Sequence, residues 1–340
     1  MSESNIDFDE IDGKSRSSKK WSAFFATVAV LLLVMLVFIF IWSSEPEPVD
    51  VGAIEKNYVG QIPRGYVTVE TTAQIVETLL DKSGGFLSND IMPPSVFMDN
   101  MPAFEFGALV QIRDITQVLR NDISRSQSQS LEDEALKFAE PAFNIDHRKW
   151  MFPRAEREYR KGVKLLRAYR DRLADPQDSN TQFYARSDNL RSWLYLVSKR
   201  LGGLSQRLSA SVGRSRINTD LSNDASAEQS TPASQIVTVK TPWMQIDDVF
   251  WEARGATWAQ IQLLKAIEKD FAHVLEDKNA RTSFQQIIME LEATQETIWS
   301  PMILNGDEFG FFSNHSLVMS SYISRANAAT IDLIDLLKGG

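Results

Sequence analysis

The stretch WSAFFATVAVLLLVMLVFIFIW, residues 21–42, divides the chain into a short tail and a large remainder. It contains no charged residue, and a helix of this length reaches about 33 Å, enough to cross the ~30 Å hydrocarbon core of a bilayer. A secretory signal has a shorter apolar region of roughly 7–15 residues, followed by an A-x-A-like cleavage site. The stretch here is followed by SSEPEP instead. We therefore predict an uncleaved transmembrane helix over residues 21–43.

The flanks of this helix predict its direction in the membrane. The four charged residues that most closely precede the helix, the last of which are Lys19 and Lys20, are basic, whereas the first charged residues after the helix are acidic. Positive charge favours the cytoplasmic side, so residues 1–20 are predicted to be a cytoplasmic tail. Trp21 and Trp42 stand one at each end, where aromatic residues favour the membrane interface. In a cell with two membranes the C-terminal part then lies in the periplasm, and the lipid bilayer is its first partner.

The composition excludes several classes of function. With 43% hydrophobic and 24% charged residues, the chain has a globular rather than a disordered character. Its net charge of −9 argues against nucleic acid as a partner. The absence of cysteine excludes disulfides, thiolate zinc sites and cysteine nucleophiles. The three histidines are far apart in the sequence and no glycine-rich phosphate loop occurs, so we predict neither a metal site nor a cofactor.

Apolar residues spaced by three and four predict helices nearly everywhere after the span. The stretch 44–66 opens with two prolines and several acids, which predicts an extended tether that lifts the domain off the lipid. Helical stripes then fill 67–212 and 242–338, which we predict to be two helical halves. Residues 213–241 between them are rich in Ser, Asn and Asp and predict a flexible loop. The predicted fold class is therefore all-α, a large multi-helix bundle behind one transmembrane helix.

The two halves show a weak sign of duplication. The stretch GALVQIRDITQVLRNDIS from residue 107 and the stretch GATWAQIQLLKAIEKDFA from residue 255 share Gly, Ala and one Asp. They also keep most apolar positions, but any two amphipathic helices share an apolar stripe. Two similar helical halves are therefore a hypothesis. The last predicted helix, 314–337, is crowded with Ser and Ala, which let helices approach closely, so we place it near the centre of the bundle.

Two further helices have distinctive surfaces. The segment 153–174 is strongly basic, and such a face meets anionic lipid or an acidic partner, or is neutralised by acids of a neighbouring helix. The segment from Leu190 to Leu208 repeats apolar residues at four and three, as a coiled-coil seam does. It predicts either a homodimer interface or a core helix of the bundle. The Gly202-Gly203 pair inside it weakens the coiled-coil alternative.

Two glutamates are candidates for a catalytic acid. Glu105 lies among aromatic residues in AFEFG, and Glu252 lies in DDVFWEARG. A desolvated Glu has a raised pKa and can protonate the leaving oxygen of a glycan. The neighbouring Asp247 and Asp248 are better explained as residues that cap an apolar helix and favour its dipole.

Several long strings of this sequence are distinctive. They include ETLLDKSGGFLSNDIMPPSVFMDNMPAFEFGALVQIRD, KTPWMQIDDVFWEARGATWA and NHSLVMSSYISRANAATIDL. Together with FYARSDNLRSWL and WSPMILNG, they resemble the bacterial family known as domain of unknown function 2333 over about residues 66–338. The resemblance implies a single-pass envelope protein of Gram-negative bacteria, which agrees with an inner-membrane anchor and a periplasmic domain. It implies no activity, substrate or catalytic residue.

We therefore expect a protein-interaction or structural role in the cell envelope, with an envelope protein as partner. The loop MPPSVFMDNMP is the candidate contact surface, because Met92, Val96, Phe97 and Met98 are apolar residues on a proline-stiffened turn. Plugging the end of the bundle explains them equally well. The alternatives are a glycan-acting enzyme and a ligand-binding sensor. A sensor would need a partner for output, since the cytoplasmic tail has only about 20 residues.

Overall fold

The computed structural model describes residues 8–127, 131–178, 180–217, 236–300, 302–306 and 311–338. Its α-helices are α1 (Phe8–Trp42), α2 (Val51–Asn57), α3 (Tyr66–Asp81), α4 (Asn100–Val118), α5 (Glu134–Phe143), α6 (Ala155–Leu173), α7 (Ser187–Ser209), α8 (Ile246–Asp270), α9 (Ala272–Asp277), α10 (Arg281–Glu292) and α11 (His315–Leu336). Short helical turns are η1 (Ser95–Phe97), η2 (Leu119–Ile123), η3 (Trp243–Gln245) and η4 (Ala293–Gln295). Strands β1 (Arg214–Ile217) and β2 (Ile236–Val239) pair antiparallel. The predicted helical fold is confirmed, with this small sheet as an addition.

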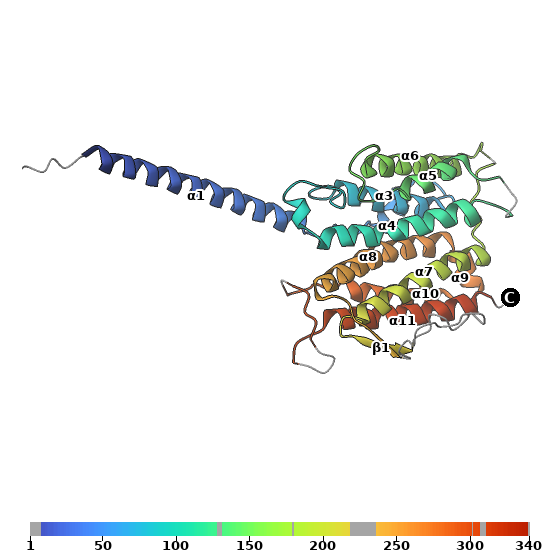
Figure 1. The fold of residues 1–340 in the computed structure, drawn as a ribbon. Helices are drawn as coiled ribbons and strands as arrows, with labels where there is room; N and C mark the ends of the chain where they lie inside the picture. The colour runs from blue at the N-terminus through green and yellow to red at the C-terminus, as the bar shows by residue number, and fades with distance from the viewer. Residues whose placement is uncertain are drawn as a thin grey trace, which may run out of the picture.

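The helix α1 projects from one end of the domain (Figure 1). Within the described residues, Trp21–Trp42 is the one span that is long and apolar enough to cross a membrane, with a mean hydropathy of 3.2. None of its most apolar window is buried against the rest of the chain. A core helix of the domain would be covered by neighbouring helices, so this stretch is not part of the core. The predicted membrane segment is the C-terminal part of a longer helix that begins at Phe8.

Most of the other helices form two four-helix units that pack against each other (Figure 1). In the first unit α3 contacts α6, α6 contacts α5, and α5 contacts α4. In the second unit α7 contacts α11, α11 contacts α10, and α10 contacts α8. Between the two units, α3 contacts α8, and in the equivalent way α7 contacts α4. The helices α3, α4, α5 and α6 are therefore equivalent in packing to α7, α8, α10 and α11.

The two units meet where α4 packs on α8 in the middle of the domain (Figure 1). A Cβ atom on Gly107 would lie 2.0 Å from the carbonyl oxygen of Glu252, and a Cβ atom on Gly255 would lie 2.0 Å from that of Phe104. Each glycine thus admits the backbone of the other helix, and the two contacts are reciprocal. These glycines begin the two stretches that align in the sequence, so the shared Gly has a packing reason.

The division between the units differs from the predicted one. Because α7 packs on α11, the boundary lies between α6 and α7, within 174–186, and not in the loop 213–241. The predicted half 67–212 therefore contains one helix too many, and the predicted half 242–338 contains one too few. The loop 213–241 carries β1 and β2, and its middle part, predicted to be flexible, lies outside the described residues.

The apolar seam of α7 is buried inside the domain. Its members are 0–6% exposed and belong to the main core: Leu190, Leu194, Val197, Leu201, Leu204 and Leu208. Of the two predicted alternatives, the core helix is therefore confirmed, and the seam is not available as a homodimer interface. The serine-rich α11 lies on the outside of the second unit and not at the centre (Figure 1). Its small residues bring it close to α7, where Ser205 contacts Ser320 at 3.1 Å.

Candidate functional site

The segment after α1 is packed on the domain, so the prediction of an extended tether over 44–66 is wrong. It contains α2, in which Val51 and Ile54 are 6% and 8% exposed. Asp50 caps this helix by accepting a hydrogen bond from the N–H of Ala53 at 3.1 Å. We call residues 45–65 the strap. Since the strap is bound to the domain, it does not act as a spacer between α1 and the bundle.

The central helix α8 holds the strap at three places along its length. The three bonds run from Arg254 to Glu45 (2.8 Å), from the Val49 N–H to Gln262 (2.7 Å) and from the Gly65 N–H to Asp270 (2.8 Å). The three α8 residues follow one another at intervals of eight, or about 12 Å along the helix axis. The strap therefore runs from the exit of α1 to the far end of α8. Each bond joins residues about 200 positions apart, which is why no local sequence pattern predicts it.

Arg254 is the centre of the first attachment. It is 4% exposed, and besides Glu45 its guanidinium donates to the backbone carbonyls of three successive residues at the end of η4: Thr294, Gln295 and Glu296. A buried guanidinium is stable when its donors are satisfied in this way. Arg254 thus joins the exit of α1, the helix α8 and the turn η4 in one cluster.

The last residue of α1 is also built into the fold. The ring of Trp42 is partly buried against the main core, and a Cβ atom on Gly84 would lie 2.7 Å from it. Gly84 has φ = +84°, a conformation that L side chains rarely adopt. The notch that receives Trp42 therefore depends on a glycine. The domain begins where α1 ends, without a flexible interval.

We call the end of the domain where α1 arrives the α1-proximal end. The loop 82–99 touches Trp42 there, and it is hydrogen-bonded to the loop 144–154. The described part of the loop 296–314 also lies at this end, because it lines a cavity together with Glu45, which directly follows α1. The turn η3 directly precedes α8, whose first residues lie on the same cavity. The four helices α4, α6, α8 and α11 all begin at this end.

These four loop segments carry many exposed large apolar side chains, and we call this set the apolar rim. Its members are Ile91, Met92, Val96, Phe97, Trp150, Met151, Phe152, Trp243, Met244, Trp299, Met302, Phe311 and Phe312. Several are almost fully exposed: Phe152 at 86%, Trp299 at 93% and Phe311 at 98%. Solvent-exposed apolar residues that gather at one end of a domain indicate an interaction surface.

The sequence predicted one segment of this rim and missed the others. Of the four predicted contact residues, Met92, Val96 and Phe97 are 71%, 52% and 66% exposed, whereas Met98 packs against the main core. The remaining rim segments contain isolated aromatic residues among polar ones. No period in the sequence separates an exposed tryptophan of this kind from a buried one.

Glu105 is sealed inside the first unit. It is 0% exposed and pairs with Lys82 Nζ at 2.9 Å. It also accepts hydrogen bonds from the N–H groups of Leu87 and Ser88, each at 2.8 Å, and from the Ser88 hydroxyl at 2.6 Å. Burial raises the pKa of Glu105, while Lys82 and these donors oppose the rise. The carboxylate holds the loop after α3 in place through these hydrogen bonds. Because Glu105 is fully buried and both its oxygens are bound, a glycan cannot reach it.

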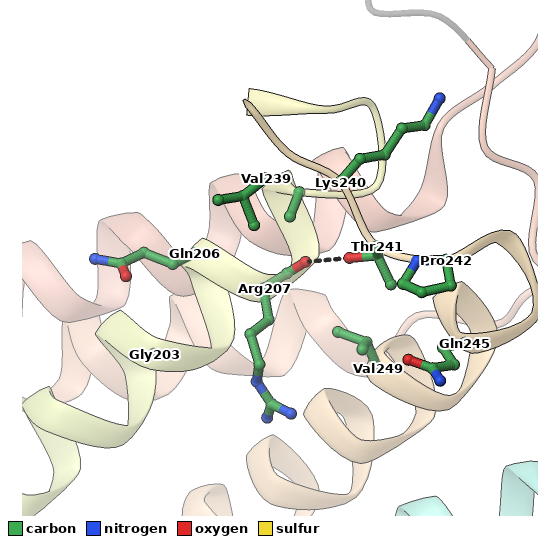
Figure 2. Close-up of a pocket in the computed structure, with 10 residues that line it drawn as sticks. Gly203, Gln206, Arg207, Val239, Lys240, Thr241, Pro242, Gln245 and Val249 are labelled. Atoms are coloured by element: carbon green, nitrogen blue, oxygen red, sulfur yellow. Dashed lines mark hydrogen bonds between the residues drawn. The ribbon is translucent and has the colours of Figure 1, made fainter. Parts of the chain in front are cut away.

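Glu252 is held by Arg207, with Arg207 nitrogens 2.7 Å and 2.5 Å from its two oxygens. This pair lies beside a groove of about 1050 Å³ between α7 and the segment that leads from β2 into α8. Figure 2 shows Arg207 pointing from α7 toward α8, with Thr241 and Pro242 on the opposite wall. The Thr241 hydroxyl donates to the Arg207 carbonyl at 3.5 Å. The groove offers backbone, apolar and amide groups together with the cations Arg207 and Lys240, a chemistry suited to binding.

A smaller cavity of about 580 Å³ lies beside the exit of α1. Glu45, Asn100, Asp247 and Trp251 are among its lining residues. Within the described part of the chain, the indole N–H of Trp251 and the side-chain oxygen of Asn100 have no hydrogen-bond partner. Asp247 lies in the first turn of α8, where its charge favours the helix dipole, but it forms no side-chain cap. The cavity can hold a small polar group.

The basic helix predicted at 153–174 is largely neutralised within the first unit. Arg160 pairs with Asp81 at 2.7 Å, and Arg167 pairs with Glu77 at 2.6 Å. Both acids lie on α3, so the neighbouring-helix alternative is the one that the structure supports. Arg167 also pairs with Glu70 of α3, as does Arg170.

These features define a helical protein whose domain is built directly onto one apolar N-terminal helix. The chain belongs to the family described as uncharacterized protein conserved in bacteria, DUF2333, whose profile matches residues 15–340. This confirms the resemblance seen in the sequence. The comparison with curated proteins gave no match, and neither did the comparison with solved structures.

Proposed function

We propose that this protein is a single-pass inner-membrane protein with its N-terminus in the cytoplasm and its helical domain in the periplasm, where the domain has a structural or protein-interaction role in the cell envelope. The basic residues before the span and the acidic residues after it support this direction. The apolar helix without a protein cover supports insertion in lipid.

The single observation that carries the proposal is the packing of Trp42 on Gly84. A signal peptide is removed, so its last residues have no place in the mature fold. Here the residue that ends α1 fills a notch of the domain, and Glu45, three positions later, binds the buried Arg254. Cleavage after the apolar helix would empty the notch. Retention of α1 as an anchor explains both contacts.

Fusions to the C-terminus test this topology. Alkaline phosphatase, which is active only outside the cytosol, should be active, whereas a fluorescent protein that matures only in the cytosol should stay dark. N-terminal sequencing of the purified membrane-bound chain should give the start of the tail. Reversed fusion activities, or a mature chain that starts near residue 45, would contradict the proposal.

The groove of Figure 2 is the candidate contact site for an envelope protein partner. Of the two carboxylates predicted as catalytic acids, Glu105 is buried, and Glu252 lines a cavity of about 360 Å³ but is paired there with Arg207. An interaction role therefore agrees better with the geometry than glycan chemistry does. A photocrosslinking amino acid at Gln245 should capture a partner in intact cells, with Met289 on the exposed face of α10 as the control position. Equal products from both positions would count against the groove.

A further inference from the structure

We propose that the apolar rim inserts into the interface of the bilayer that α1 crosses, so that the domain lies on the membrane through its α1-proximal end. This inference rests on the proposed function, because it requires α1 to stay in the membrane. The occupant of the rim is the phospholipid interface, and the rim is the domain's second attachment to lipid besides the span itself.

The apolar rim lies close to the point where α1 leaves the membrane. Trp42 ends the apolar helix, and an aromatic residue at this place lies at the level of the lipid headgroups. The ring of Trp42 is at the same time in contact with Gly84, which belongs to the rim loop 82–99. The strap adds no spacing, because Glu45 is already bound to Arg254. The loops of the α1-proximal end therefore lie within reach of the headgroup region.

The residue types of the rim are those that favour a membrane interface. Trp, Phe and Met make up most of its members, and amphipathic aromatic rings favour the boundary between water and hydrocarbon. Trp243 is 85% exposed and has Lys240 close before it in the chain. The rim loops also carry charges of both signs, such as Arg148 beside Asp99 and Asp248, so the attraction to the interface comes from the apolar side chains.

The opposite end of the domain provides the contrast. Its described loops, 58–65, 119–127, 131–133, 174–178, 180–186 and 271–280, contain two exposed large apolar residues, Val59 and Leu131. Both ends consist of loops of similar kind in the same two units. An apolar surface that arose without function would be spread over both ends, and not concentrated at the end from which α1 emerges. A bilayer at that end explains the concentration.

The test uses the full chain in nanodiscs of phosphatidylethanolamine and phosphatidylglycerol, with one protein per disc. Because the chain has no cysteine, single substitutions Phe97→Cys and Trp243→Cys accept an environment-sensitive fluorophore at one site each. Leu131→Cys is the control at the distant end, and Val37→Cys reports on α1. Circular dichroism verifies that each variant keeps the helical fold.

Lipid-attached nitroxides should quench the probes at positions 97, 243 and 37, and their emission should shift to shorter wavelength, while the probe at 131 should be quenched only by aqueous iodide. A quenched probe at 37 with both rim probes open to iodide would overturn the inference and leave the anchor intact. In that case the rim would meet a protein or a second copy of this chain. A probe at 37 open to iodide would overturn the anchor and the inference together.

Discussion

Two equivalent helix pairs of this domain, α3 with α6 and α7 with α11, are held together by different chemistry. In the first unit the pair is joined by ion pairs, with Glu70 and Glu77 of α3 bound to Arg167 of α6. In the second unit the pair is joined by hydroxyl contacts, with Ser205 of α7 bound to Ser320 of α11. The packing scheme is nevertheless the same.

This difference shows which contacts are needed for the packing order that the two units share. It requires an apolar face on each helix and close approach of α4 and α8, which the two glycines provide. It does not require particular polar residues at the outer interfaces, so these differ between the units. This explains why the two halves share few identities although their helices pack in the same order. The predictions below test the shared part first and the divergent part afterwards.

The largest effect is expected at the shared helix contact. Gly255→Val should abolish stable folding, because a Cβ atom would lie 2.0 Å from the Phe104 carbonyl oxygen and the clash is with backbone. We expect a loss of more than about 3 kcal/mol in the free energy of unfolding. Thermal unfolding followed by circular dichroism measures it.

The matched control is Gly203→Ala in α7, where an added Cβ meets nothing within 4 Å. This variant should gain about 0.5–1 kcal/mol, because glycine is unfavourable in a helix interior. Equal stability of the Gly255→Val and Gly203→Ala variants would contradict the account of the α4–α8 contact.

The next effect concerns Asp270, which holds the strap on the second unit. Burial raises its pKa to about 6, against hydrogen bonds from Thr68 and Gly65. The folded state thus binds a proton at Asp270 more tightly than the unfolded state does. The stability that comes from this proton is fully present below pH ~4 and is lost as the pH rises through about 6. Because the pKa of Asp270 rises from its usual value near 4 to about 6, the loss amounts to about 3 kcal/mol.

Unfolding free energies measured from pH 4 to 7 should therefore fall less steeply in Asp270→Asn than in the natural chain. The slope is the readout, since the new amide also changes the hydrogen bonds to the strap. Asp122, the aspartate that aligns with Asp270, is half-buried, and burial raises its pKa too. Asp122→Asn should retain most of the slope. If the two variants changed the slope equally, Asp270 would not have the special position assigned to it.

A smaller effect distinguishes the two helix pairs. Burial alone would raise the pKa of Glu70, but Arg167, Gln74 and Arg170 bring it below its usual value. Its contribution is therefore present above pH ~4.5 and lost as the pH falls through the folded-state pKa. Glu70→Gln should cost about 1–2 kcal/mol at neutral pH and low salt, and less at high salt.

Ser320→Ala, at the equivalent interface of the second unit, should cost about 1 kcal/mol from lost hydrogen bonds. This loss should not depend on salt, because no ion pair is broken. Denaturant unfolding of both variants at two salt concentrations makes the comparison. A salt-dependent loss in Ser320→Ala, or a salt-independent one in Glu70→Gln, would contradict the proposed difference between the interfaces.

The sequence predicted the elements of this fold better than their arrangement. Apolar periodicity located the helices, because a buried stripe leaves the same mark in any helical fold. It did not tell which surface covers the stripe, and so the seam from Leu190 to Leu208 left both a dimer interface and a core helix open. The serine-rich α11 suggested the centre because small residues permit close packing, but the glycines of α4 and α8 hold that place.

The strap and the rim show the limits at the candidate site. The prolines before α2 suggested an extended tether, but Arg254, Gln262 and Asp270 supply partners from a distant part of the chain. For the rim, the proline-rich loop at Phe97 was recognisable because several apolar residues adjoin a turn. A single exposed residue such as Trp299 has no apolar neighbours in the sequence that would mark it. Only the structure shows that these residues lie together at the end of the domain where α1 arrives.

The central claim is that α1 and the domain form one rigid body, joined by the packing of Trp42 on Gly84 and by the bond between Glu45 and Arg254. Distances between spin labels test it most directly, with Phe40→Cys on α1 and Met289→Cys on α10, both exposed positions, in the otherwise cysteine-free full chain in nanodiscs. The account predicts a single narrow distance distribution, because the strap and Trp42 fix α1 to the bundle. A broad distribution, as a flexible tether would give, would contradict it.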